Sequence, residues 1–230
     1  MFIPASPISV LFFEMIVVVV IFAVLAATKH AYRENPARAR QLAIRVFVVL
    51  VVWLGTMAAL ITSGKMESLP LQGFPVFVGS VLLISIGAAL APFGRKLAAH
   101  TPLIALVAFQ AFRLPLELVL HYWARRGTIP TAMTWSGQNW DVIAGALAFV
   151  IWPVAGKYRA IAWIFNLIGL SLLINVLRVA LMSSTAPFGW ALSPPLQLWL
   201  HVPYFMIGPV LVGGAIFGHL VLTRALLRKS

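Results

Sequence analysis

Cysteine is absent from this chain of 230 residues, and acidic side chains are scarce. Without cysteine there is no disulfide bond, no thiolate metal ligand and no cysteine nucleophile. Only five Asp and Glu residues accompany 17 Lys and Arg residues, and charged residues make up 10% of the chain. Soluble domains carry about 25% charged residues. The low share of charge therefore argues against a soluble protein.

Apolar side chains take the place of the missing charge, at 62% of the chain. Runs of about 20 apolar residues are typical of helices that cross a membrane. We predict an all-α polytopic transmembrane bundle of seven helices, forming a single transmembrane domain over residues 1–230 with the lipid bilayer as its partner. The predicted spans are 9–28, 42–63, 74–93, 102–123, 140–156, 160–182 and 199–222. The run at 140–156 is the shortest.

Basic residues alternate between the loops of this topology. Eleven fall on the side of the first, third and fifth loops and the C-terminal tail, and three fall on the other side. Cytoplasmic loops are enriched in Lys and Arg, so the N-terminus is expected outside and the C-terminus in the cytoplasm. The expected location is the cytoplasmic (inner) membrane of a bacterial-type cell. This distribution explains the net charge of +12 without nucleic acid as a partner.

The stretch FRLPLELVLH places Arg113, Glu117 and His121 four residues apart in a predicted spanning helix. At 3.6 residues per turn, these side chains share one face of the helix. A charged residue near the bilayer centre costs about 2.5–3.5 kcal/mol and by default marks a functional site. Pro115 lies within the row and is expected to distort the helix and free a backbone carbonyl.

Further polar residues are predicted at the outer ends of the neighbouring helices. With Arg113, Glu117 and His121 they form the candidate ligand-binding set; the added members are Asn139, Asp141, Asn175, Arg178, His201 and Tyr204. We expect an outward-facing pocket that binds a small polar or amphiphilic ligand, because small-molecule sites combine apolar walls with a few polar groups. In this hypothesis Arg113 and Arg178 are anion clamps.

Three alternatives remain open from the sequence. A metal could bind His121, His201 and Glu117, or a haem could bind the histidines, in a membrane enzyme or redox component. The chain has no HExxH or GxSxG motif, no lysine in the run 199–222 for a retinal Schiff base, and no identified cofactor. The charges could instead form structural pairs, Glu117 with Arg113 and Asp141 or Glu14 with Arg178. The protein could also be a structural subunit, bound to another membrane protein or to a second copy.

Two motifs in the middle of the chain resemble a group of small bacterial membrane proteins without an assigned activity. In that group an F-R-x-x-x-E helix is followed by M-T-x-x-G-x-N-x-D. The matching positions are Phe112, Arg113, Glu117, Met133, Thr134, Gly137, Asn139 and Asp141. The resemblance implies that these residues belong to one site.

Overall fold

A computed structural model describes residues 2–66, 68, 73–186 and 188–228 of the chain, and all regular structure in these residues is helical. Six helical segments of the described residues are long and apolar enough to cross a membrane, as expected of a multi-pass membrane protein. They are α1 (Pro7–Ala31), α2 (Pro36–Thr62), α3 (Gly73–Leu90), the segment Leu103–Arg125, α8 (Arg159–Ser183) and the segment Tyr204–Leu227.

The run predicted at 140–156 differs from the other six. It forms α7 (Asp141–Ile151), which is too short to cross a membrane as a helix. The chain reaches α7 through a segment that contains the short 3-10 helix η2 (Thr131–Met133), and Thr128, Ile129 and Met133 of this segment are buried. Non-helical backbone at membrane depth is tolerated where protein surrounds it. The count of seven spanning helices is therefore not reproduced among the described residues.

Two of the long segments change helix type along their length. Leu103–Arg125 consists of α5 (Leu103–Ala108), the 3-10 turn η1 (Phe109–Phe112) and α6 (Arg113–Arg125). The last segment consists of the 3-10 turn η4 (Tyr204–Ile207), the π-helical turn η5 (Gly208–Val212) and α9 (Gly213–Leu227). The changes lie beside Pro115 and Pro209, where proline removes a backbone donor. The change beside Pro115 fits the distortion that the sequence predicts there.

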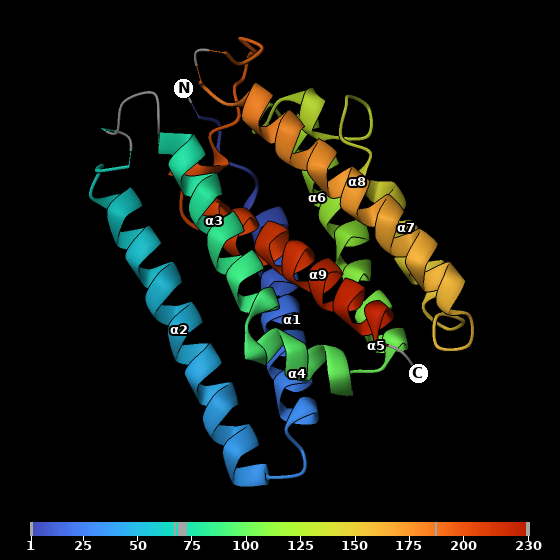
Figure 1. Ribbon diagram of the computed structural model, residues 1–230. Coiled ribbons are helices and arrows are strands. Elements are labelled where there is room, and N and C mark those ends of the chain that lie inside the picture. Colours follow the sequence, from blue (N-terminus) through green and yellow to red (C-terminus); the bar gives the residue numbers. More distant parts are fainter. Residues whose placement is uncertain (1, 67, 69–72, 187, 229–230) are drawn as a thin grey trace.

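Figure 1 shows α9 in the middle of the bundle and α2 at its edge, with the two termini at opposite ends. Most of the apolar stretch of Tyr204–Leu227, which ends in α9, is buried, whereas that of α2 has no buried residue. Arg224 of α9 donates hydrogen bonds to the carbonyl oxygens of Ala89 and Ala91, where α3 ends and α4 (Pro92–His100) begins. Because the last carbonyls of a helix have no partner within it, this arginine ties α3 to the central helix.

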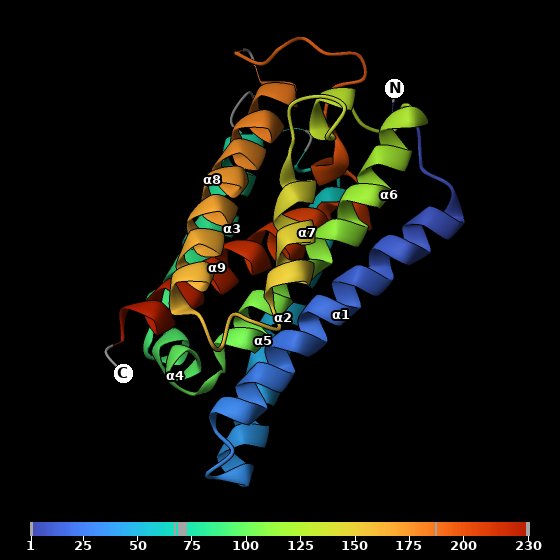
Figure 2. The ribbon, with the colours of Figure 1, turned by 90° about the vertical axis from the view of Figure 1, so that its right-hand side faces the viewer.

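A close approach of α7 to α6 depends on Gly145. The two helices lie side by side in Figure 2, and a Cβ atom on Gly145 would overlap the backbone of Leu114. Glycine lets the helices approach because it has no side chain. Since Asp141 begins α7 one turn away, this contact also sets where Asp141 lies relative to α6.

Replacing Gly145 by alanine should separate α7 from α6. We expect Gly145→Ala to lower the free energy of unfolding by about 1–3 kcal/mol, because the added methyl group would clash with backbone. Thermal unfolding in detergent, followed by tryptophan fluorescence, would measure it. Gly87→Ala is the matched control, since no atom lies within 4 Å of a Cβ placed on Gly87 in α3. A Gly145→Ala variant as stable as this control would contradict the assignment.

Candidate functional site

A buried ion pair joins Arg113, the first residue of α6, to Asp141, the first residue of α7. Nε of Arg113 donates to Oδ2 of Asp141 at 2.7 Å, and Nη2 pairs with Oδ1. Both side chains are almost completely enclosed, with 1% and 7% of their surfaces exposed. Guanidinium and carboxylate groups match in this two-pronged geometry, which makes the pair strong and directional. It connects the two helices at their starts.

Asn139 connects the ion pair to Glu117. Its side-chain nitrogen donates to Oε1 of Glu117 at 2.9 Å and to the carbonyl oxygen of Met133 at 3.0 Å. Its side-chain oxygen accepts from the backbone N–H of Asp141 at 3.1 Å. All three bonds are made by a residue with no exposed surface. Asn139 therefore holds the segment before α7 in place and brings Glu117 into the same network.

His219 of α9 extends the network toward the other end of the bundle. Nη1 of Arg113 lies 3.0 Å from Nε2 of His219. Because a guanidinium only donates, Nε2 must be the acceptor and Nδ1 must carry the proton. Nδ1 then donates to Oδ1 of Asn166 at 2.9 Å, and Nδ2 of Asn166 donates to the hydroxyl of Thr223 at 2.7 Å. The chain of bonds requires a neutral histidine.

The backbone of α8 makes room for this histidine at Gly169. A Cβ atom on Gly169 would overlap the imidazole ring of His219. The His219 side chain is fully buried between α8 and α9 and also contacts Phe165, with the ring centres 5.8 Å apart. Glycine at this position of α8 is thus required by the site.

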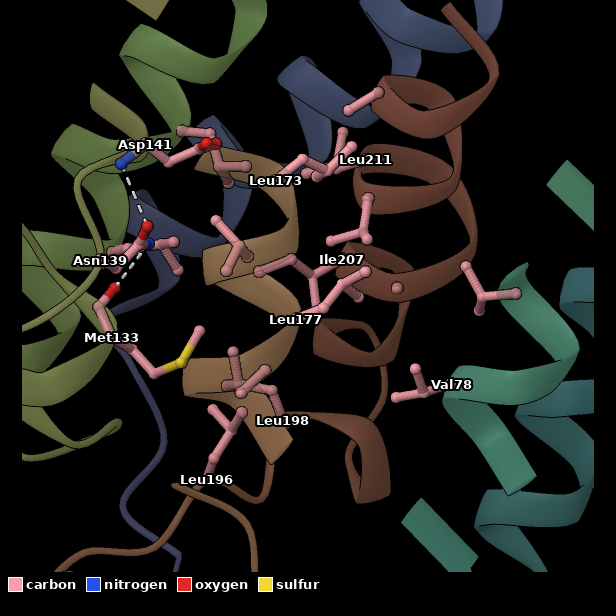
Figure 3. A pocket seen from close by; sticks show the side chains of 18 of the residues that line it. Val78, Met133, Asn139, Asp141, Leu173, Leu177, Leu196, Leu198, Ile207 and Leu211 are labelled. Carbon is pink, nitrogen blue, oxygen red and sulfur yellow. Dashed lines mark hydrogen bonds between the residues drawn. The ribbon is translucent and has the colours of Figure 1, made fainter. Parts of the chain in front are cut away.

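A cavity of about 80 Å³ borders the network. Figure 3 shows Asn139 and Asp141 on one side of it and Val78 of α3 on the opposite side. Its walls come from α3, α6, α8, the segment before α7, and the start of the last segment, and they are mostly apolar. The polar side chains in the lining are Arg113, Glu117, Asn139, Asp141 and Trp199.

Two polar atoms of the cavity lining have no hydrogen-bond partner among the described residues. They are Oε2 of Glu117 and Nε1 of Trp199, which belongs to the 3-10 turn η3 (Leu198–Leu200). Glu117 is 1% exposed and Trp199 is 6% exposed. A buried polar group without a partner costs about 1–3 kcal/mol. Both residues line the cavity, so one unused acceptor and one unused donor belong to side chains of its wall.

Arg113 does not face the cavity as a free cation. Each of its three nitrogen atoms already makes a hydrogen bond, to Asp141 or to His219. The sequence suggests that Arg113 pairs with Glu117 and that Arg178 pairs with Asp141 or Glu14. In the structure Arg113 instead pairs with Asp141, and Glu117 accepts a hydrogen bond from Asn139. The geometry therefore does not support an anion clamp at Arg113.

His121 lies outside the cavity lining although it shares a helix with Arg113 and Glu117. Its ring stacks on Trp135 with the ring centres 4.1 Å apart, and its Nδ1 atom is buried without a described partner. Eight residues along an α-helix accumulate a rotation of about 80° beyond two full turns. That drift turns the third member of the row away from the first.

The other four predicted site residues form two separate groups. Arg178 of α8 donates to the side-chain oxygens of Gln138 and Asn175 and lies 5.5 Å above the Trp190 ring. His201 stacks on Phe2 at 3.8 Å between ring centres. The Tyr204 hydroxyl accepts a hydrogen bond from the backbone N–H of Ala5. Asn175, Arg178, His201 and Tyr204 do not line the cavity.

The predicted metal ligands are not gathered into one site. His121, His201 and Glu117 have different neighbours, and the described part of the chain has no group of three or more His, Asp or Glu side chains able to hold a metal ion. A zinc site needs at least three protein ligands around one point. The structure gives no support to the metal alternative at these residues.

The sequence interpretation missed three residues of the site, namely His219, Asn166 and Trp199. His219 is predicted near the cytoplasmic end of its helix, and Trp199 near the outer boundary. The available signal for His219 was the polar series Asn166, His219 and Thr223 within otherwise apolar runs. Pairing these residues requires knowing that α8 and α9 are neighbours.

Removing one partner of the ion pair should be costly. We expect Asp141→Asn to lower the free energy of unfolding by about 3–5 kcal/mol, because it leaves Arg113 charged and buried without a counter-ion. Replacing both partners, as Arg113→Met with Asp141→Leu, should recover much of this loss. Denaturant unfolding in detergent would measure both variants.

The Lys96–Glu34 pair, 3.7 Å apart, provides the control, because Glu34 is exposed and Lys96 only half-buried. Glu34→Gln should change the free energy of unfolding by less than about 1 kcal/mol, since solvent screens this pair. Equal effects of Glu34→Gln and Asp141→Asn would show that the buried pair does not hold α7 against α6.

The site thus consists of a neutralised arginine, a second carboxyl group with an unused oxygen, and an adjoining apolar cavity. Such a site can bind, orient and exchange hydrogen bonds with a small molecule. The resemblance noted for the two motifs implies one site, and the structure joins Arg113, Glu117, Asn139 and Asp141 in one network. The chain matches no protein-family model, no curated protein and no solved structure.

Proposed function

We propose that this membrane protein binds a small amphiphilic molecule in the cavity beside Glu117. The observation that carries the proposal is the pair of unused polar atoms, Oε2 of Glu117 and Nε1 of Trp199, on side chains of a mostly apolar lining. A ligand with a hydrogen-bond donor and an acceptor on an apolar body would satisfy both atoms. Groups that are satisfied only when a ligand is bound contribute to affinity and to specificity.

The charge of the site selects the polar end of the ligand. Asp141 already neutralises Arg113, so the carboxyl group of Glu117 has no guanidinium of its own. A carboxylate ligand would find no free cation there, and an ionised group is costly to bury without a partner. A hydroxyl or amine can donate to Glu117. The favoured ligand therefore carries a hydroxyl or amine rather than an acid group.

The volume of the cavity limits the ligand. A water molecule takes about 30 Å³ in the liquid, so a cavity of about 80 Å³ holds the equivalent of two or three waters. That volume suits a group of a few heavy atoms. We infer that the bound part of the ligand is a short apolar chain with one polar end.

Three butyl compounds test the preference for the polar end. We expect n-butanol and n-butylamine at millimolar concentrations to raise the thermal unfolding temperature of the detergent-solubilised protein, and butyrate to have no effect. The reason is that only the first two donate to Glu117, and a ligand stabilises the state that binds it. Stabilisation by butyrate alone would support an anion site instead.

Variants of the lining provide controls for this measurement. Glu117→Leu and Ala180→Leu, which fills the cavity, should abolish the stabilisation by n-butanol, because both residues line the cavity. Trp199→Phe removes the unused donor and should weaken the stabilisation by n-butanol. Trp53→Phe is the matched control, since Nε1 of Trp53 is likewise buried without a described partner but lies outside the cavity. Equal losses in both tryptophan variants would indicate a non-specific solvent effect.

We further propose that the chain crosses the membrane seven times, with α7 and the segment before it forming the fifth crossing. An odd number of crossings is supported by the opposite positions of the termini in Figure 1. The excess of basic residues in the loops beside α4 and the C-terminus supports a cytoplasmic location for that side. The cavity then lies in the outer half of a protein of the cytoplasmic membrane, and the N-terminus is outside.

Single cysteines test this topology because the chain has none of its own. Ser136→Cys, at an exposed position of the segment before α7, should react with a membrane-impermeant maleimide in intact cells. Arg40→Cys, near the start of α2, should react only after the membrane is permeabilised. The unmodified protein controls for background labelling. The reverse pattern would show the opposite orientation.

A further inference from the structure

A second hollow, here called the lateral groove, runs along the outside of the bundle between α1 and the α5–α6 segment. Its volume is about 1540 Å³, far larger than that of the cavity. Figure 2 shows α1 on this face of the molecule, running obliquely past α6 toward α5. Small residues on both walls hollow the groove, because they leave space between the helices; they include Ala23, Ala27, Ala105, Ala108 and Gly218.

The lining of the lateral groove is apolar over most of its length and contains no acidic residue among those described. Phe12, Leu118 and Phe149 lie along it with more than half of each side chain exposed. In a bilayer, water does not fill such a space, and hydrocarbon does so without the cost of burying polar groups. The body of the occupant is therefore hydrocarbon.

One end of the lateral groove is basic and polar. His30, near the end of α1, lines the groove, and Nη1 of Arg33 donates to its Nε2 at 2.7 Å. Lys29 precedes His30; we call Lys29, His30 and Arg33 the basic cluster. Thr101 lines the groove as well, and its hydroxyl oxygen is buried without a described partner. An anionic group at this end would meet cations and an unused hydroxyl.

The nearest carboxylate in the sequence does not neutralise the basic cluster. Glu34 follows Arg33, but its side chain lies 3.7 Å from the ammonium of Lys96 on α4. The cluster is therefore available to an anion from outside the protein. A second copy in the same membrane orientation would bring its own basic cluster to the same side, where the two would repel each other.

We propose that the lateral groove is a binding site for one anionic phospholipid, with its acyl chains between α1 and the α5–α6 segment and its phosphate at the basic cluster. Basic residues beside a membrane attract anionic lipids, and the hydrocarbon wall selects acyl chains over polar partners. This site does not depend on the ligand of the cavity. Phe112 borders both spaces, and no polar residue of the cavity lies in the groove.

Native mass spectrometry of the full chain tests the proposal. The protein is released from mixed micelles of phosphatidylglycerol and phosphatidylcholine that carry the same acyl chains. We expect one retained phosphatidylglycerol per chain in preference to phosphatidylcholine. Lys29→Gln with Arg33→Gln should reduce that preference about fivefold for each charge removed. Arg40→Gln, an exposed basic residue outside the groove, should leave the preference unchanged.

Groove-filling variants test the place of the acyl chains. Ala105→Phe should abolish lipid retention, whereas Ala160→Phe on the exposed start of α8 should not. Ala105→Leu adds less volume and serves if the larger variant fails to fold. The proposal would be overturned if both lipids were retained alike, or if the groove variants retained lipid as the unmodified protein does. A dimer that disappears in the groove variants would also overturn it. The butyl compounds should still stabilise the groove variants, so failure here is distinct from failure of the cavity hypothesis.

Discussion

The ion pair between Arg113 and Asp141 is the interaction on which the middle of the bundle depends. It joins two helices at their first residues, and each partner is too deeply buried to be left alone. Replacing such a pair with apolar residues often costs little, so its presence is weak evidence for stability alone. Its contribution here is to orient the helices, because one guanidinium holds α7 through Asp141 and α9 through His219.

The irregular backbone before α7 positions Asp141 for this pairing. α7 has only 11 residues, and a partly buried segment without a long helix leads the chain to Asp141. Asn139 supplies the hydrogen bonds that such backbone needs, to the Met133 carbonyl and the Asp141 N–H. Gly145 and Gly169 then allow the helices and the His219 ring to approach. The polar network and the irregular segments therefore depend on each other.

The cavity and the lateral groove place different demands on a ligand. The cavity is small and lies within the bundle, and the polar atoms left unused in its lining are on Glu117 and Trp199. The groove is large and mostly lined by apolar side chains, and its basic cluster lies at one end. One fold can serve both, because the groove lies between α1 and the α5–α6 segment, whereas the cavity lies among α3, α6 and α8.

The sequence by itself determined that the chain is helical and apolar enough for a multi-pass membrane protein. It grouped Arg113, Glu117, Asn139 and Asp141 only within a predicted site of nine residues. Apolar runs can be read directly from the sequence, so the helices are predictable. A charged side chain buried in lipid needs polar partners, so the polar residues of these runs are expected to lie together. Only the tertiary structure decided which partner each group has. It paired Arg113 with Asp141 and His219, moved His121 and Arg178 away from the cavity, and shortened the fifth helix. Those outcomes depend on helix rotation and on which helices are neighbours, and neither is encoded in the spacing of residues along one helix.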